Sequence, residues 1–148
     1  MRDIDYQSVA ESVIEDNRYL ALATTDGTAP WVATIEYIGG ENGTFYFFST
    51  TDSRHAEHID QHSTVAVAIW GPDQPEYTPE TSTVMRGVQI EGEAHRIPPD
   101  DRPEAVRGAI EALKPPMPPY AAYEIVAERV YTPVLEDGVN KRVEVELG

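Results

Sequence analysis

Alternating apolar and polar positions predict that most of this chain forms β-strands. The alternation covers residues 19–25, β-branched and aromatic residues fill 30–38, and 45–48 is an unbroken aromatic run. The Asp26–Gly27 pair between the first two segments is a strong signal for a tight turn. These three segments are therefore predicted to form an antiparallel meander.

Later segments continue the strand pattern. Four of them have a β-type composition: 65–70, 84–97, 123–133 and 142–147. Gly87 and Gly92 within the second of these predict bulges or bends in a long strand. The stretch 71–81 contains three prolines, which predicts a loop between the first two segments.

Three short helices are predicted, over 6–16, about 53–61 and 101–113. Asp5 is the expected N-cap of the first helix, and Asp52 or Ser53 caps the second. The expected apolar face of the third helix consists of Ala105, Ala109 and Leu113. No repeated strand–helix–strand rhythm is present, so the prediction is a mainly β fold, a small closed or nearly closed barrel with inserted helices. The length of 148 residues predicts one domain over 1–148.

The charge of the chain limits its partners. Acidic residues outnumber basic ones by 26 to 11, which gives a net charge of −15. Such a surface repels nucleic-acid phosphates and anionic lipid heads, so we expect neither as a partner. Cysteine is absent, which excludes thiolate catalysis and disulfides. The longest purely apolar run, 65–70, is far shorter than the roughly 20 residues that span a bilayer, so we expect a cytoplasmic protein.

Two explanations of the acidity remain open at this point. One is a halophilic protein, because salt at about 1 M screens charges within about 3 Å and removes the repulsion between surface carboxylates. The other is an acidic surface that binds a partner. The scarcity of lysine, with only Lys114 and Lys141 in the chain, favours the halophilic interpretation.

Candidate chemistry lies at the end of the aromatic segment. Five small hydroxyl or carboxylate residues, Ser49 to Ser53, follow it, and Arg54 and His55 then open the predicted second helix. Backbone N–H groups at a helix N-terminus, hydroxyls and a guanidinium are the groups that hold a phosphate. The segment therefore indicates a phosphate site, with a simple capped turn as the alternative.

This segment, a strand followed by hydroxyls and Ser-Arg-His at a helix start, resembles the pyridoxamine 5'-phosphate oxidase-like FMN-binding split barrels. Residues 19–30 resemble the first hairpin of that family, 65–70 its strand after the phosphate helix, and 86–94 its long strand. The resemblance implies a six-stranded antiparallel split β-barrel of Greek-key type with short inserted helices. It also implies a homodimer with FMN at the subunit interface.

The resemblance assigns twelve cofactor-binding residues: Trp31, Val32, Ala33, Thr34, Phe48, Ser49, Thr50, Ser53, Arg54, His55, Arg86 and Gly87. Ser49 and Arg54 would contact the FMN phosphate, and the residues from Trp31 to Thr34 would border the isoalloxazine ring. His55 stands where the family has lysine, which weakens the site near neutral pH unless the imidazole is protonated. Gly87 replaces a glutamine that is common at its position.

The resemblance implies an FMN-binding oxidoreductase with a small-molecule substrate or electron donor. The segment 141–148 lacks the Arg-Leu-His type sequence that grips the substrate phosphate in vitamin B6 oxidases, so we expect another substrate. No catalytic acid or base is predicted, because the flavin performs the electron transfer. The alternatives are a non-catalytic flavin- or haem-binding module and a deazaflavin-dependent reductase.

Two further side-chain sets have ordinary structural interpretations. His55, His58 and His62 have the i, i+3, i+7 spacing of a metal-binding helix face, but a solvated face is the more common outcome and no metal is expected. Trp31 and Trp70 are more often packing residues than flavin-stacking ones.

Overall fold

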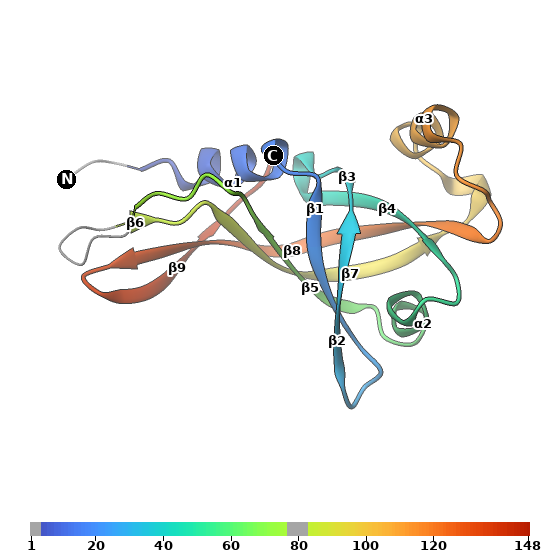
Figure 1. Ribbon diagram of the computed structural model, residues 1–148, viewed down its shortest axis with the longest axis horizontal. Coiled ribbons are helices and arrows are strands. Elements are labelled where there is room, and N and C mark those ends of the chain that lie inside the picture. Colours follow the sequence, from blue (N-terminus) through green and yellow to red (C-terminus); the bar gives the residue numbers. More distant parts are fainter. Residues whose placement is uncertain (1–3, 77–82) are drawn as a thin grey trace.

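One antiparallel β-sheet dominates the computed structural model, which describes residues 4–76 and 83–148 (Figure 1). Its strands are β1 (Tyr19–Thr25), β2 (Pro30–Glu36), β3 (Ile38–Gly39), β4 (Thr44–Thr50), β5 (Thr64–Trp70), β6 (Thr83–Val84), β7 (Gly87–Ile97), β8 (Tyr120–Glu136) and β9 (Val139–Val145). The helices are α1 (Tyr6–Asp16), α2 (Arg54–Gln61) and α3 (Glu104–Leu113), with short 3-10 turns η1 (Glu41–Gly43) and η2 (Pro99–Asp101).

The sheet curls into a barrel that is split along one side. Its strand order is β2-β1-β5-β7-β8-β4-β3, and β6 and β9 each pair with β8. The strands at the two ends of this order, β2 and β3, are consecutive in the chain and separated only by Tyr37. In the part of the chain that the structure describes, no ladder joins β2 to β4. The predicted mainly β split barrel is therefore confirmed.

The strands outnumber the seven segments predicted from the sequence pattern and the six implied by the family resemblance, because two of those segments are interrupted. Residues 30–38 divide at Tyr37 into β2 and β3, and 84–97 divides at Met85 and Arg86 into β6 and β7. The described residues thus form nine strands, two of which have two residues each.

The predicted meander is wrong at its third strand. β1 and β2 form the expected hairpin, but β4 pairs with β8 and β3, not with β2. Gly39 and Gly40 have φ angles of 79° and 102°, which side-chain-bearing residues rarely adopt, and they reverse the chain ahead of β4. This reversal places β4 at the end of the sheet opposite β2, next to the edge strand β3, and leaves the split between β2 and β4.

Helices α1 and α2 begin at the expected caps. Asp5 accepts a hydrogen bond from the backbone N–H of Ser8, at 3.1 Å, and Ser53 rather than Asp52 caps α2. Helix α3 begins three residues later than predicted, at Glu104, because residues 99–101 form η2. Its buried contact is Val106, and Leu113 is exposed, so the expected apolar face is also wrong.

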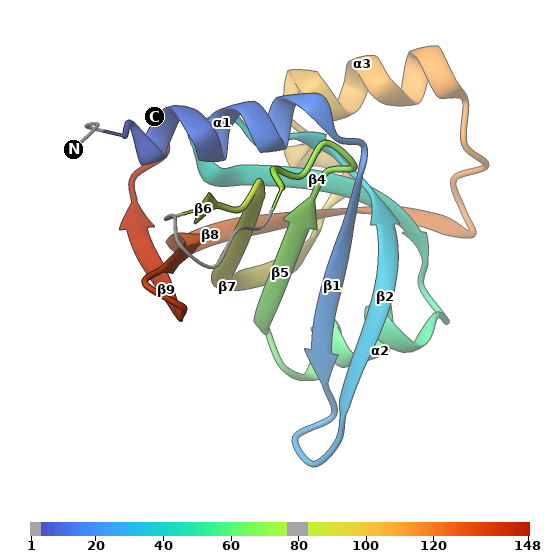
Figure 2. The same ribbon diagram turned by 60° about the vertical axis from the view of Figure 1, so that its left-hand side comes forward.

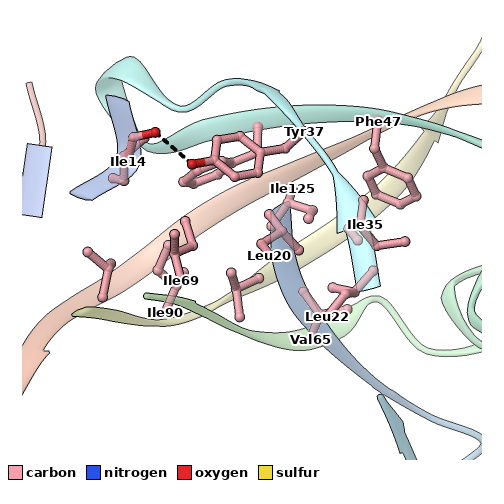
Figure 3. Close-up of a cluster of buried hydrophobic side chains, with 14 of the residues drawn as sticks. Ile14, Leu20, Leu22, Ile35, Tyr37, Phe47, Val65, Ile69, Ile90 and Ile125 are labelled. Atoms are coloured by element: carbon pink, nitrogen blue, oxygen red, sulfur yellow. Dashed lines mark hydrogen bonds between the residues drawn. The ribbon is translucent and has the colours of Figure 1, made fainter. Parts of the chain in front are cut away.

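The core fills the barrel and extends under α1, which crosses one end of the curved sheet (Figure 2). Figure 3 shows Tyr37 at this end, where its hydroxyl donates a 2.6 Å hydrogen bond to the Ile14 carbonyl. The Tyr37 ring meets Phe45 edge to face, with centroids 5.5 Å apart, and burial raises the pKa of Tyr37 to about 12. The residue that separates β2 from β3 thus also ties α1 to the barrel.

Gly87 and Gly92 are bends, as predicted. The register between β7 and β8 shifts at Glu91/Gly92, where a β-bulge bends the long strand. Gly87 lies at the break between β6 and β7, and its N–H donates to the Met85 carbonyl two residues earlier. The predicted loop over 71–81 has no regular structure in 71–76, and the rest of it lies outside the described residues.

No helix within 4–76 and 83–148 is long and apolar enough to cross a membrane.

Few of the carboxylates in the described residues have a cationic partner, which gives a prediction on salt. Four ion pairs with Arg or Lys form there: Arg18–Glu36, Arg86–Asp16, Arg96–Asp60 and Lys141–Glu136. If the acidity is a halophilic adaptation, the melting temperature should be higher in KCl at about 1 M than in dilute buffer, because screening removes carboxylate repulsion. Thermal unfolding at both salt concentrations measures this. Equal melting temperatures would favour an acidic partner surface.

Candidate functional site

A cavity of about 550 Å³ opens at the split between β2 and β4. Its lining residues are Thr34, Ile35, Glu36, Tyr37, Ile38, Phe48, Ser49, Thr50, Ser53, His55, Leu113 and Tyr120. Six of the twelve residues assigned by the family resemblance are among them: Thr34, Phe48, Ser49, Thr50, Ser53 and His55. Strand β4 and the start of α2 supply most of these six, so the split brings the hydroxyl-rich segment to the edge of β2.

Three polar side chains form a hydrogen-bonded cluster at the base of this cavity. The buried Ser49 hydroxyl lies 2.8 Å from Nε2 of His55 and 3.0 Å from the Ser53 hydroxyl. The Ser53 hydroxyl accepts a hydrogen bond from the Ala56 N–H, which is the N-cap interaction of α2. The N–H groups of Arg54 and His55, in the first turn of α2, have no acceptor within the helix. The Ser49 and Ser53 hydroxyls, which also lie 3.2 Å and 2.9 Å from the Thr50 carbonyl, thus gather beside the first turn of α2.

His55 is an uncharged member of this cluster at neutral pH. Half-burial, and next the neighbouring His58, lower the pKa of His55 from its ordinary value of 6.5. His58 itself is buried, with Nδ1 2.9 Å from the Thr24 hydroxyl, whereas His62 is exposed. The three histidines therefore do not form the solvated face expected for them.

The lowered pKa of His55 predicts a pH effect on stability. Because the unfolded chain binds the His55 proton more tightly than the folded chain, stability falls as the pH drops through 6.5. The free energy of unfolding should therefore fall less for His55→Gln than for the parent between about pH 7.5 and about pH 5.5. Denaturant unfolding at several pH values measures both slopes. Equal slopes would show that His55 does not titrate in this way.

Arg54 lies beside the cavity on an aromatic ring. Its guanidinium carbon is 4.3 Å from the centroid of Trp31, at the start of β2. Trp31 is 39% exposed and Trp70 is 62% exposed, so neither tryptophan is a core residue. The structure thus brings together Arg54 and Trp31, two of the assigned residues that lie outside the cavity lining.

Arg86 and Gly87, which the resemblance also assigns to the cofactor, lie away from the Ser49 cluster. The Arg86 guanidinium donates to Asp16 at 3.0 Å and to the Ser12 hydroxyl at 3.1 Å, so it is held by α1. Gly87 lines a separate, mostly apolar cavity of about 580 Å³ that also includes Trp70. Within one chain, these two assigned residues are therefore apart from the Ser49 cluster.

Val32 also lines a different hollow from the Ser49 cluster. It is 62% exposed and borders a cavity of about 340 Å³ on the outer face of β1 and β5. The alanines of this cavity form two cross-strand pairs, Ala21 with Ala68 and Ala23 with Ala66. The outer face of the sheet thus has a shallow hollow whose alanine floor is bordered by Gln89, Glu91 and Arg142.

Sequence reasoning missed six residues of the cavity at the split: Ile35, Glu36, Tyr37, Ile38, Leu113 and Tyr120. The first four directly follow the assigned Thr34 in the chain, whereas Leu113 and Tyr120 come from distant segments. Leu113 ends α3 and is 66% exposed, and Tyr120 begins β8 opposite Thr50. Both come from segments more than 50 residues beyond β4, and neither carries a local motif. Only the β4–β8 pairing, which the sequence pattern did not reveal, brings them to the site.

Comparisons with known proteins agree on one family and fold. A family model described as pyridoxamine 5'-phosphate oxidase matches residues 7–132. None of the curated proteins matches the chain.

Three solved structures illustrate the shared fold. A candidate pyridoxamine 5'-phosphate oxidase from Listeria innocua is 18% identical, with a TM-score of 0.65 over 86% of this chain and 98% of that one. A heme binding protein from Mycobacterium smegmatis is 16% identical, with a TM-score of 0.66 over 99% of this chain and 60% of that one. A FAD-binding protein from Mesorhizobium loti is 17% identical, with a TM-score of 0.57 over 93% of each chain.

Proposed function

Because the chain belongs to the pyridoxamine 5'-phosphate oxidase family, we propose that it is an FMN-binding oxidoreductase. The family model covers residues 7–132, which include the barrel up to the middle of β8. The observation that carries the proposal is the cluster at the start of α2, where the Ser49 and Ser53 hydroxyls line an open cavity and Arg54 lies beside it. The substrate is a small molecule whose identity the proposal leaves open.

The residues present fit the phosphate of FMN. Ser49 and Ser53 offer hydroxyls, the first turn of α2 offers N–H groups, and the helix dipole adds positive potential. Arg54 forms no ion pair within the described residues, although the chain carries 26 carboxylates. Its guanidinium edge is therefore available for a charge-assisted contact with phosphate.

The remaining parts of the cofactor would lie along the split. The edge of β2 that faces β4 has no ladder partner among the described residues, so its backbone groups between Trp31 and Thr34 can pair with polar atoms of a flavin ring. Phe48 and Thr50, with Leu113 and Tyr120, would shield the cavity from water. FMN would supply hydride or electron transfer, and the chain would bind and orient it.

A homodimer with FMN at the subunit interface would bring Arg86 and Gly87 of one subunit to the Ser49 cluster of the other. Arg86 and Gly87 are apart from the Ser49 cluster in one chain, so a second copy would have to supply them to the cofactor. The exposed apolar residues around them, Trp70 and Met85, are the kind of surface that a partner subunit covers. The alanine-lined outer face of β1 and β5 supports the same proposal, since its small side chains let a second sheet approach closely there.

Reduction of the bound flavin tests the oxidoreductase part of the proposal. FMN-loaded protein is mixed anaerobically with NADH or NADPH, and the visible flavin absorption is followed before and after an electron acceptor is added. We expect bleaching by one of the two donors and recovery with the acceptor. Tight FMN binding without reduction by either donor would instead favour a non-catalytic flavin-binding module.

A further inference from the structure

The contact between Arg54 and Trp31 is suited to position a phosphate ligand. Trp31 lies on the same face of β2 as the buried Ile35, because alternate residues of a strand share a face. The β1–β2 ladder pairs Trp31 with Thr24, so its place is set by the barrel. Arg54, by contrast, is an exposed side chain at the first position of α2. A ring carried by a paired strand thus lies against the long, exposed side chain of Arg54.

One guanidinium group can contact an aromatic ring and bind a phosphate at the same time. The guanidinium carbon of Arg54 lies over the Trp31 ring, 4.3 Å from the ring centroid. The N–H donors lie at the edge of the guanidinium plane, where they can form two parallel bonds to phosphate oxygens. A cation–π contact does not use up the N–H donors, so the ring can hold the guanidinium while those donors stay available for phosphate.

The orientation of Arg54 matters because nearby carboxylates compete with a phosphate for its guanidinium group. Hydrogen bonds from the Ala29 and Thr28 N–H groups, with smaller contributions from His58 and Arg54, lower the pKa of Asp26 in the β1–β2 turn. Asp26 is thus an ionised group near Arg54, and the chain as a whole carries a charge of −15. Without Trp31, Arg54 could turn toward such carboxylates and away from Ser49.

We propose that Trp31 is a positioning residue that holds Arg54 in its phosphate-binding orientation. The inference rests on the proposed function, since it takes Arg54 as a ligand of the FMN phosphate. It assigns Trp31 a role through Arg54 that differs from contact with the flavin ring. Removal of the Trp31 ring should then weaken the binding of ligands that carry a phosphate more than the binding of ligands that lack one.

The test compares FMN with riboflavin, which has the same ring and no phosphate. Both affinities are measured for the parent, Trp31→Phe, Trp31→Leu, Arg54→Ala and the double variant Trp31→Leu/Arg54→Ala. Loss of the cation–π contact in Trp31→Leu should weaken FMN binding about fivefold relative to riboflavin binding. Trp31→Phe keeps an aromatic face and should retain most of the FMN affinity. In the double variant, Trp31→Leu should add nothing to the loss caused by Arg54→Ala, because its effect passes through that residue.

The outcomes separate this inference from the proposed function. If Arg54→Ala leaves FMN affinity unchanged, the phosphate site and the inference both fail. If Arg54→Ala weakens FMN binding but Trp31→Leu does not, only the inference fails. Equal losses of FMN and riboflavin affinity in Trp31→Leu, or additive losses in the double variant, would also overturn it, because they indicate direct flavin contact.

Discussion

Arg54→Ala is expected to weaken FMN binding by about tenfold or more. A hydrogen bond to a charged group contributes about 1.5–3 kcal/mol, and each 1.4 kcal/mol corresponds to about a tenfold change in affinity. His55, the neighbour in the cluster, is poorly suited to replace the lost charge, because burial lowers its pKa and disfavours the protonated imidazole. Arg54 is exposed, so the variant should keep the stability of the parent. Titration with FMN, followed by quenching of its fluorescence, measures the effect.

Two matched variants control for the change in charge. Arg107→Ala removes the same charge from an exposed position of α3 outside the cavity lining, and should leave FMN affinity unchanged. His55→Lys introduces a cation beside Ser49 and should keep or tighten FMN binding, provided that the position faces the phosphate. The phosphate-site assignment fails if Arg54→Ala binds FMN like the parent. It fails equally if Arg107→Ala loses as much affinity, which would indicate only a long-range charge effect.

Of the substitutions predicted for this protein, Gly92→Ala is expected to lower the free energy of unfolding most. At the β7 bulge, a Cβ on Gly92 would collide with the backbone carbonyl oxygen of Val126 on β8. Backbone atoms of a paired strand cannot move aside without breaking the ladder, so we expect a loss of about 3 kcal/mol, the upper end for overpacking. For a domain of this size, that corresponds to a melting temperature lower by roughly 10 °C.

Gly108→Ala is the matched control for this change. Gly108 is exposed in the middle of α3, and a Cβ added there would meet nothing within 4 Å. Alanine should therefore stabilise the helix by about 0.5–1 kcal/mol, through its higher helix propensity. Thermal or denaturant unfolding of both variants measures the contrast. A Gly92→Ala protein as stable as the parent would show that β8 does not approach β7 so closely.

Elements with local signals could be predicted from the sequence. The bounds of α1 follow from the Asp5 cap, and those of β1 from the Asp26–Gly27 turn. The partner of β4 could not be predicted, because β8 lies some 70 residues further along the chain and its alternation would suit several neighbours. A meander would need only short turns between neighbouring strands. In the folded protein the curl of the sheet places β4 beside β8 instead of β2.

In the candidate site, too, the residues with a local sequence signal could be predicted and those brought in by the tertiary fold could not. Ser49, Ser53 and His55 lie within seven residues of one another, so one turn brings them together and their motif is visible in the sequence. Leu113 and Tyr120 reach the cavity only through the tertiary fold. The pairing of Arg86 with Asp16 of α1 joins segments 70 residues apart and has no sequence signal.

Uptake of FMN by the purified protein tests the central claim most directly. The protein is prepared in KCl at about 1 M, its absorption spectrum is recorded, and it is titrated with FMN, with FAD, haem and a deazaflavin as comparisons. We predict a yellow protein, or binding of one FMN per subunit with submicromolar affinity and in preference to the other three. A colourless protein that takes up no flavin would contradict the account, although the split barrel would still stand.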